Sequence, residues 1–417
     1  MKTLSALTVV AVFLLVLTAA EPALAQEPLT VFRSDEVGPA TWKIDEEGFL
    51  NILSYQLPIE SELPWTLADR GYRVTLGSLD QSKLWHDQEL RIRAKLNDSL
   101  SVMVHAVGSV DFDSYYVYIQ PILEWEVFEG GEILFPTSVE FDKGYFNFGL
   151  GFRWRAPESG IDYLQLTWVR ADALFGSHQI DYDKTKVNDP ADTFEFQGMG
   201  RLGDLGTSRL KVAWLTKSSF TYEDLDQTEE FERLYAHWIH RVDLSPSVPL
   251  FFEFETDDAE EALLTGEPDV REDEFEGKRE YYRFRTECHF TLAEETAERI
   301  RGGLQYLYYM QDEDLPNKSR QINKSLTGEL TVYGGYRYPF TDSFSLEGII
   351  YAMWRNARQR YPNSDFLDDR YDHSFQAKLN LQLRWDLSES ATFILIPSFE
   401  LDSFGWGGGG FQLTYMF

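Results

Sequence analysis

The chain of 417 residues has a single cysteine, Cys288. One thiol cannot build an internal disulfide framework or a four-thiolate metal site. The sequence also lacks a Cys-x-x-Cys-His motif, so the chain does not attach a c-type haem of its own. Basic residues are scarce, because 38 Lys and Arg stand against 69 Asp and Glu and leave a net charge of −31. This balance argues against nucleic-acid binding, which needs a basic surface.

Long hydrophobic runs are absent after the first 25 residues, so no later segment can span a bilayer as a helix. At the N-terminus, Lys2 precedes an apolar stretch over 7–20, and Ala23-Leu24-Ala25 has the small-x-small pattern of a cleavage site. We therefore expect a secretory signal peptide at 1–25 and a mature start at Gln26. A membrane anchor is the weaker alternative, because the apolar run is short. No cysteine follows that run, which excludes a lipoprotein anchor.

Sequence motifs of catalysis are lacking too. The chain has no Gly-x-Ser-x-Gly, no His-Glu-x-x-His and no glycine-rich phosphate loop. His237 and His240 flank Trp238 in an expected strand and so point to opposite faces, which argues against joint metal ligation. The acidic stretch 365–369 is a weak calcium candidate. We expect no catalytic residue, metal or cofactor, although a triad assembled across strands would leave no motif.

Aromatic residues are abundant: 22 Tyr, 30 Phe and 11 Trp make up 15% of the chain, yet the mean hydropathy is −0.34. A membrane β-barrel reconciles these values, because its lipid-facing and lumen-facing residues alternate and average out. Strand-like alternation begins at residue 70 and predicts about eighteen strands, with sixteen as the lower bound. Short connections such as Asn97-Asp98 alternate with longer ones such as 176–192 and 258–278. The predicted fold is an all-β, transmembrane, antiparallel up-and-down barrel with short periplasmic turns and long extracellular loops. The expected strands are 70–80, 84–96, 99–110, 115–128, 133–141, 144–156, 161–175, 193–202, 207–220, 231–243, 247–257, 279–290, 297–311, 325–338, 342–356, 373–386, 390–402 and 408–417.

Within the strands one face is apolar and the other polar. From Phe146 to Trp154 every even position is apolar, whereas Asn147, Arg153 and Arg155 share the other face. A soluble β-sandwich would alternate as well. It would not place its large aromatics near strand ends, as the girdles of a membrane barrel require. Such positions are Trp154, Trp168, Trp354, Trp385 and Tyr338.

The C-terminal stretch 411–417 alternates apolar residues at every second position and ends on Phe417. Together with the signal peptide, it resembles the C-terminal signature of Gram-negative outer-membrane β-barrel proteins. The resemblance implies that Tyr415 and Phe417 form an assembly signal for the barrel-assembly machinery. It also implies residence in the outer membrane, in contact with lipid and lipopolysaccharide. The architecture resembles that of porin-like channels. The expected strand number, together with the basic inward face described below, resembles that of 18-stranded substrate-specific porins and alginate-export barrels.

The segment 26–69 differs from the rest, because it holds four prolines and mixed charge without a sustained period. It is either a periplasmic extension or a plug that folds into the lumen, and the sequence leaves both open. We therefore divide the chain into 1–25, 26–69 and the barrel at 70–417.

The inward face of the expected strands is rich in arginine. A basic wall biases a pore toward anions, because the low-dielectric surroundings focus its field. The alternative is that inward Arg and Glu pair across strands and neutralise each other. The excess negative charge is expected in the loops, chiefly 257–276, and in the N-terminal segment. The expected pore-lining, charge-selecting residues are Arg91, Arg93, Arg153, Arg155, Arg233, Arg283, Arg285, Arg299, Arg301, Arg337, Arg355 and Arg384.

Three non-enzymatic functions fit such a barrel, and a barrel enzyme is the fourth, disfavoured hypothesis. The first is a passive channel for hydrophilic, preferably anionic solutes. The second is an export conduit for an acidic polysaccharide, assisted by periplasmic partners. The third is a structural sheath around a periplasmic or extracellular partner such as a multihaem cytochrome, which would supply the redox chemistry itself.

Overall fold

The computed structural model describes residues 42–44, 50–52 and 70–416. Within 70–416, the structure does not describe positions 190 and 403 or the connections 79–83, 112–113, 141–144, 171–184, 202–205, 223–226, 246–247, 266–272, 293–298, 315–321 and 361–369. The expected signal peptide, most of the segment 26–69, the calcium candidate at 365–369 and Phe417 therefore lie outside the described residues. No α-helix of the described part is long and apolar enough to cross a membrane.

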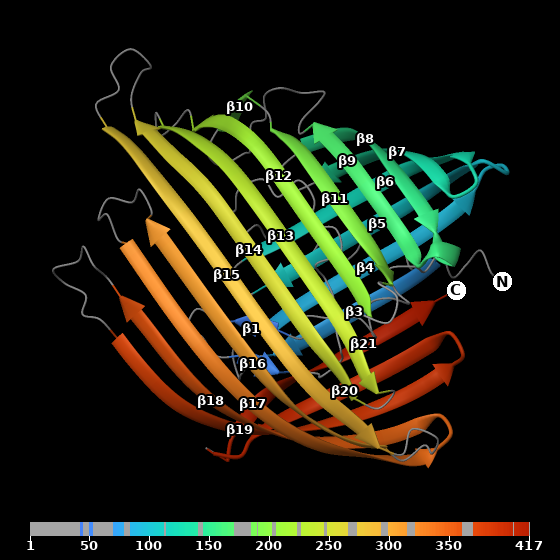
Figure 1. Cartoon of the computed structure of the whole chain (residues 1–417), viewed down its shortest axis with the longest axis vertical. Coiled ribbons are helices and arrows are strands. Elements are labelled where there is room, and N and C mark those ends of the chain that lie inside the picture. The colour runs from blue at the N-terminus through green and yellow to red at the C-terminus, as the bar shows by residue number, and fades with distance from the viewer. Residues whose placement is uncertain are drawn as a thin grey trace.

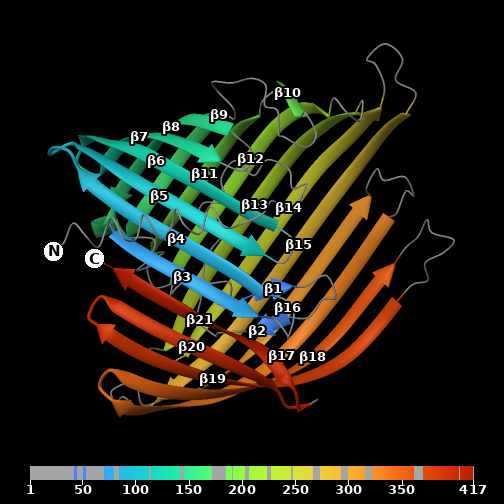
Figure 2. The same cartoon turned by 180° about the vertical axis from the view of Figure 1, so that it is seen from behind.

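Eighteen antiparallel strands of the described residues close into a barrel (Figures 1 and 2). Each strand pairs with its neighbours in sequence, β21 pairs with β3, and β9 pairs with β11. The strands are β3 (Arg70–Ser78), β4 (Leu84–Lys95), β5 (Leu100–Asp111), β6 (Ser114–Phe128), β7 (Gly131–Glu140), β8 (Tyr145–Ala156), β9 (Ile161–Arg170), β11 (Asp192–Arg201), β12 (Thr207–Tyr222), β13 (Gln227–Ser245), β14 (Val248–Thr265), β15 (Asp273–Leu292), β16 (Arg299–Asp314), β17 (Ile322–Thr341), β18 (Phe344–Arg360), β19 (Arg370–Ser388), β20 (Ala391–Glu400) and β21 (Trp406–Met416). The predicted antiparallel β-barrel and its eighteen strands are confirmed.

Three further strands add to these eighteen, and of the three only β10 belongs to the same sheet. β10 (Thr185–Asp189) pairs with residues 219–222 at the C-terminal end of β12, on the side where β11 also pairs. β1 (Trp42–Ile44) and β2 (Leu50–Ile52) form a two-stranded antiparallel ribbon of their own. In the two opposite views, this ribbon lies within the outline of the barrel.

The alternation read from the sequence places the apolar face outward. On β8, Phe148, Leu150 and Phe152 are exposed on the outer surface, whereas Asn147 on the other face is fully buried. On β17, Leu330 and Val332 are exposed while Thr331 between them is buried. Large apolar side chains exposed all around a closed barrel, over a polar interior, are the pattern of a barrel that lies in lipid.

Two aromatic belts bound this apolar band. Phe344 faces Trp385 across β18 and β19 near the short turns, and Trp354 faces Phe375 ten residues along the same pair. Ten residues span about 33 Å along a strand. At the usual tilt of about 40°, that is about 25 Å along the membrane normal, the height of the apolar band in outer-membrane barrels.

The strands are unequal in length, and this corrects two expectations. β13, β14, β15, β17 and β19 have 18–20 residues, while β3, β7, β9 and β20 have 9 or 10. The connection expected at 258–278 is therefore partly strand, and the connection expected at 176–192 contains the strand β10. Most of the acidic stretch 257–276 belongs to β14 and β15 rather than to a loop, because these strands continue pairing beyond the apolar band.

One turn depends on glycine. Gly206, before β12, has φ +106°, and an added Cβ would lie 1.8 Å from the carbonyl oxygen of Arg241. That conformation is rarely open to other residues. The glycine therefore lets the chain pass close to β13 as it re-enters the barrel.

Candidate functional site

The candidate site is the inner wall of the barrel, where all twelve predicted arginines lie. Among the described residues, ten of the twelve have a carboxylate within ion-pair distance. The inner wall is thus largely a lattice of ion pairs. This arrangement favours the cross-strand pairing interpretation over a uniformly basic pore.

One set of pairs centres on Glu89 of β4, which is 4% exposed. Its carboxylate accepts hydrogen bonds from Arg73 of β3 at 2.6 Å and from Arg91 at 3.1 Å. His105 of β5 lies 2.8 Å away. Sequence reasoning did not select Arg73 or assign His105 a partner, because cross-strand register is invisible in one sequence.

A second set lies beside it, around Glu124 of β6. Arg93 reaches this carboxylate at 2.8 Å and Arg153 at 2.9 Å, and Arg153 also lies 3.2 Å from Glu132. Arg155 is 3.7 Å from Glu132, and its side chain is 37% exposed, so it is the most open of the group. These residues border a cavity of about 150 Å³ in the wall. Its remaining lining includes the apolar side chains Met103, Ile122, Leu134 and Pro136.

A third set centres on Glu253 of β14. This carboxylate lies 2.6 Å from Arg285, 2.9 Å from Arg283 and 2.9 Å from the Nε2 atom of His237. Nearer the long connections, Arg233 donates two hydrogen bonds to the carboxylate of Asp257, at 2.6 and 2.5 Å. The two residues therefore form a bidentate ion pair. His240, by contrast, stacks on the outward Trp238, so the two histidines do point to opposite faces as predicted.

The remaining arginines with a partner lie on β16, β18 and β19. Arg301 pairs with Glu347 at 2.6 Å, Arg355 with Glu329 at 3.6 Å and Arg384 with Asp386 at 3.0 Å. The acidic partner lies two strands away for Arg301, on the adjacent strand β17 for Arg355 and on the same strand for Arg384.

Arg299 and Arg337 differ from the other ten. They face each other directly across β16 and β17, near the short turns. Arg337 donates a hydrogen bond to the hydroxyl of Ser345 at 2.9 Å. No carboxylate of the described residues lies within ion-pair distance of either guanidinium group. Among the described residues, these two are therefore the members of the twelve without an ion-pair partner, and Glu347 of β18 lies opposite Arg337 in the strand register.

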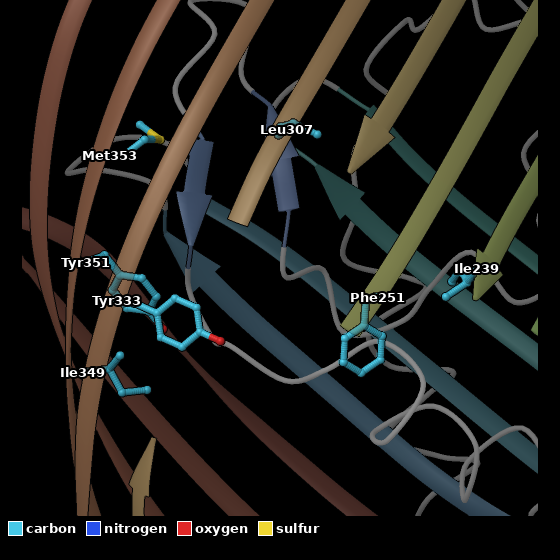
Figure 3. Close-up of a cluster of buried hydrophobic side chains, with 7 residues drawn as sticks. All are labelled: Ile239, Phe251, Leu307, Tyr333, Ile349, Tyr351 and Met353. Carbon is cyan, nitrogen blue, oxygen red and sulfur yellow. The ribbon is translucent and has the colours of Figure 1, made fainter. Parts of the chain in front are cut away.

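The inner wall also carries an apolar patch, which sequence reasoning missed. It is formed by seven buried side chains shown in Figure 3: Ile239, Phe251, Leu307, Tyr333, Ile349, Tyr351 and Met353. Tyr333 lies across the wall over Gly303 and donates a hydrogen bond to Glu287 at 2.9 Å. A signal was available, because β18 is apolar at consecutive positions around Ile349 and Ile350 rather than alternating. We name these seven residues the inner apolar patch.

Two predictions remain, the absence of a metal site and the assembly signal at Tyr415 and Phe417. Among the described residues, no cluster of three or more His, Cys, Asp or Glu side chains could hold a metal ion. Tyr415 lies on β21, 43% exposed, opposite Tyr72 of β3. Phe417 lies outside the described residues, so the assembly signal stays a prediction.

Known proteins resemble this chain in shape but not in sequence. No family model and no curated protein sequence matches it. Among solved structures, it is similar to OccAB3 of Acinetobacter baumannii, with a TM-score of 0.38 and 10% identity over 84% of this chain and 99% of that one. The outer membrane channel DcaP of Acinetobacter baumannii gives 0.38 and 10% over 84% and 96%. A bacterial polysaccharide outer membrane secretin gives 0.37 and 10% over 84% and 98%. At these values the function must be argued from the residues of the chain itself.

Proposed function

We propose that the chain is a non-enzymatic, passive channel for hydrophilic solutes in the outer membrane of a Gram-negative bacterium. The observation that carries this proposal is the closed eighteen-stranded barrel with an apolar outer band and a polar inner wall. Barrels of 16–18 strands enclose a lumen wide enough for an aqueous path unless something fills it.

The second part of the proposal is a modest preference for anions. Since ten of the twelve arginines are paired, the preference rests on few residues rather than on the whole wall. Arg299 and Arg337 place uncompensated positive charge at the periplasmic mouth, where it raises the local concentration of anions. Arg155 of β8 lies across the barrel from β16 and β17 and is 3.7 Å from Glu132. Its positive charge adds to the attraction of anions.

Single-channel recording in a planar bilayer tests the proposal, with the full chain and a variant lacking residues 27–66 measured side by side. A salt gradient then gives the ion preference from the reversal potential. We expect discrete conductance in at least one of the two proteins, with a reversal potential on the anion side. A folded barrel that conducts in neither form would overturn the channel function.

The two alternative functions have their own outcomes in the same system. An export conduit would show channel block by acidic polysaccharide fragments from the periplasmic side. A sheath around a multihaem cytochrome would conduct steadily when empty and close only when that partner is added. No feature of the described residues favours either over the passive channel.

A further inference from the structure

The outer face of β18 becomes basic immediately beyond the apolar band. Trp354 lies at the aromatic border nearer the long connections, and Arg358 and Arg360 follow it on the same face of the strand, because they stand at even steps from it. The strand register confirms this orientation. Arg358 lies directly between Leu326 of β17 and Tyr371 of β19, and both of these neighbours are exposed on the outer surface.

A third cation on this face comes from the neighbouring strand. Lys324 of β17 pairs directly with Arg360, so the two side chains share the outer face. Lys324 is exposed and lies 2.5 Å from Asp312 of β16. No carboxylate of the described residues lies within ion-pair distance of Arg358. Lys324, Arg358 and Arg360, which we name the outer basic surface, therefore exceed the one acidic side chain that pairs with them here.

The guanidinium group of Arg358 is oriented by an aromatic ring. It lies over the ring of Tyr371, 5.0 Å from the ring centroid. A cation–π contact holds the planar group by its face and leaves the N–H groups at its edge able to donate hydrogen bonds. Phosphate oxygens match this edge well, because two parallel N–H groups can bind them together.

The distance of this surface from the apolar band suits a lipid headgroup. Arg358 lies four residues beyond Trp354, which is about 13 Å along the strand and about 10 Å along the membrane normal at the usual tilt. The headgroup region extends about 5–8 Å beyond the hydrocarbon core on each side, and a long arginine side chain can reach back into it. The long connections lie at this end of the barrel, which is the outer side expected for such a protein.

We propose that the outer basic surface binds the phosphate groups of lipopolysaccharide in the outer leaflet. A row of directly paired outward residues shows where such a site ends. The row is acidic at Asp258, Glu280 and Asp312 on β14–β16, and it becomes basic at Lys324 and Arg360 on β17 and β18. Phosphate is repelled from the first part and attracted to the second. The site is therefore confined to β17–β19, and it does not depend on whether the barrel conducts.

Native mass spectrometry of the full chain in detergent tests the proposal. The protein is titrated with lipid A, the phosphorylated anchor of lipopolysaccharide, and separately with the same lipid after removal of its phosphates. We expect the phosphorylated lipid to bind at least tenfold more tightly. Arg358→Gln combined with Arg360→Gln should lower that affinity at least fivefold. The matched control, Lys95→Gln combined with Lys217→Gln, removes the same charge from β4 and β12 and should change the affinity less than twofold.

A charge-conserving variant separates loss of charge from loss of fold. Arg358→Lys combined with Arg360→Lys keeps the positive charge, so it should retain the affinity for lipid A within about threefold. The comparison of the two lipids needs no variant at all. Equal affinity of the unaltered chain for both lipids would overturn the proposal. An equal loss in the Gln variant and in its matched control would also overturn it, because the attraction would then come from net charge rather than from this surface.

Discussion

The rings of Phe344 and Trp385 lie 4.4 Å apart between centroids and are nearly parallel, at 26°. The same two strands carry a second aromatic pair, Trp354 and Phe375, at 5.2 Å. These pairs mark the lower and upper borders of the apolar band. The distance of an outward residue from these two pairs therefore gives its depth in the membrane.

A positive charge on the outer surface should cost most halfway between the two pairs. Ile350 lies there on β18, whereas Leu387 lies beyond Trp385 near the turn; both are exposed outward residues. We expect Ile350→Arg to lower the free energy of unfolding by about 2–4 kcal/mol and Leu387→Arg by about 0–1 kcal/mol. Urea unfolding in lipid vesicles, followed by tryptophan fluorescence, measures both. Equal costs would mean that the band is misplaced.

Removal of the Glu253 carboxylate should destabilise the barrel. Arg283, Arg285 and His237 all contact this buried group, and its loss removes their shared acceptor. Breaking a buried ion pair on one side costs roughly 3–5 kcal/mol. We therefore expect Glu253→Ala to lower unfolding stability by about 3 kcal/mol. Glu126→Ala, at an exposed position, should change it by less than about 0.5 kcal/mol, and a cost for Glu253→Ala as small as this would contradict the prediction.

Ion preference should depend on the two arginines without a carboxylate partner. Arg299→Gln combined with Arg337→Gln removes uncompensated positive charge, so the reversal potential in a salt gradient should move toward the cation side. The control removes a neutral pair on other strands, with Arg233→Gln combined with Asp257→Asn. That variant should keep the original reversal potential. The opposite ranking would place the selective charge in the paired lattice instead.

The glycine before β12 should tolerate no side chain. Gly206→Ala places a methyl group 1.8 Å from the carbonyl oxygen of Arg241 at φ +106°. We expect a loss of roughly 1–3 kcal/mol in unfolding stability, with a lower yield of folded barrel. Gly334→Ala is the matched control, because an added Cβ there meets no atom within 4 Å. If the two variants were equally stable, the turn would be less constrained than its geometry indicates.

The amino-acid sequence alone predicts the barrel, a strand number of sixteen to eighteen and the face that the alternating positions present. It could do so because strand alternation has a fixed period of two and because lipid imposes an apolar outer face on every strand. Phe148 and Asn147 therefore took opposite sides as expected. Strand ends were less predictable, since β14 and β15 continue pairing through an acidic stretch that has the composition of a loop.

The partners of the inward charges become visible only in the folded barrel. Arg301 and Arg299 are alike in sequence, yet Glu347 neutralises the first while the second faces Arg337. The difference arises from register between strands distant in sequence, and no local pattern encodes it. The inner apolar patch arises in the same way, because strand pairing brings side chains of five different strands to the same face of the sheet. Strand pairing therefore turns an arginine-rich face into a largely paired lattice with an apolar patch beside it.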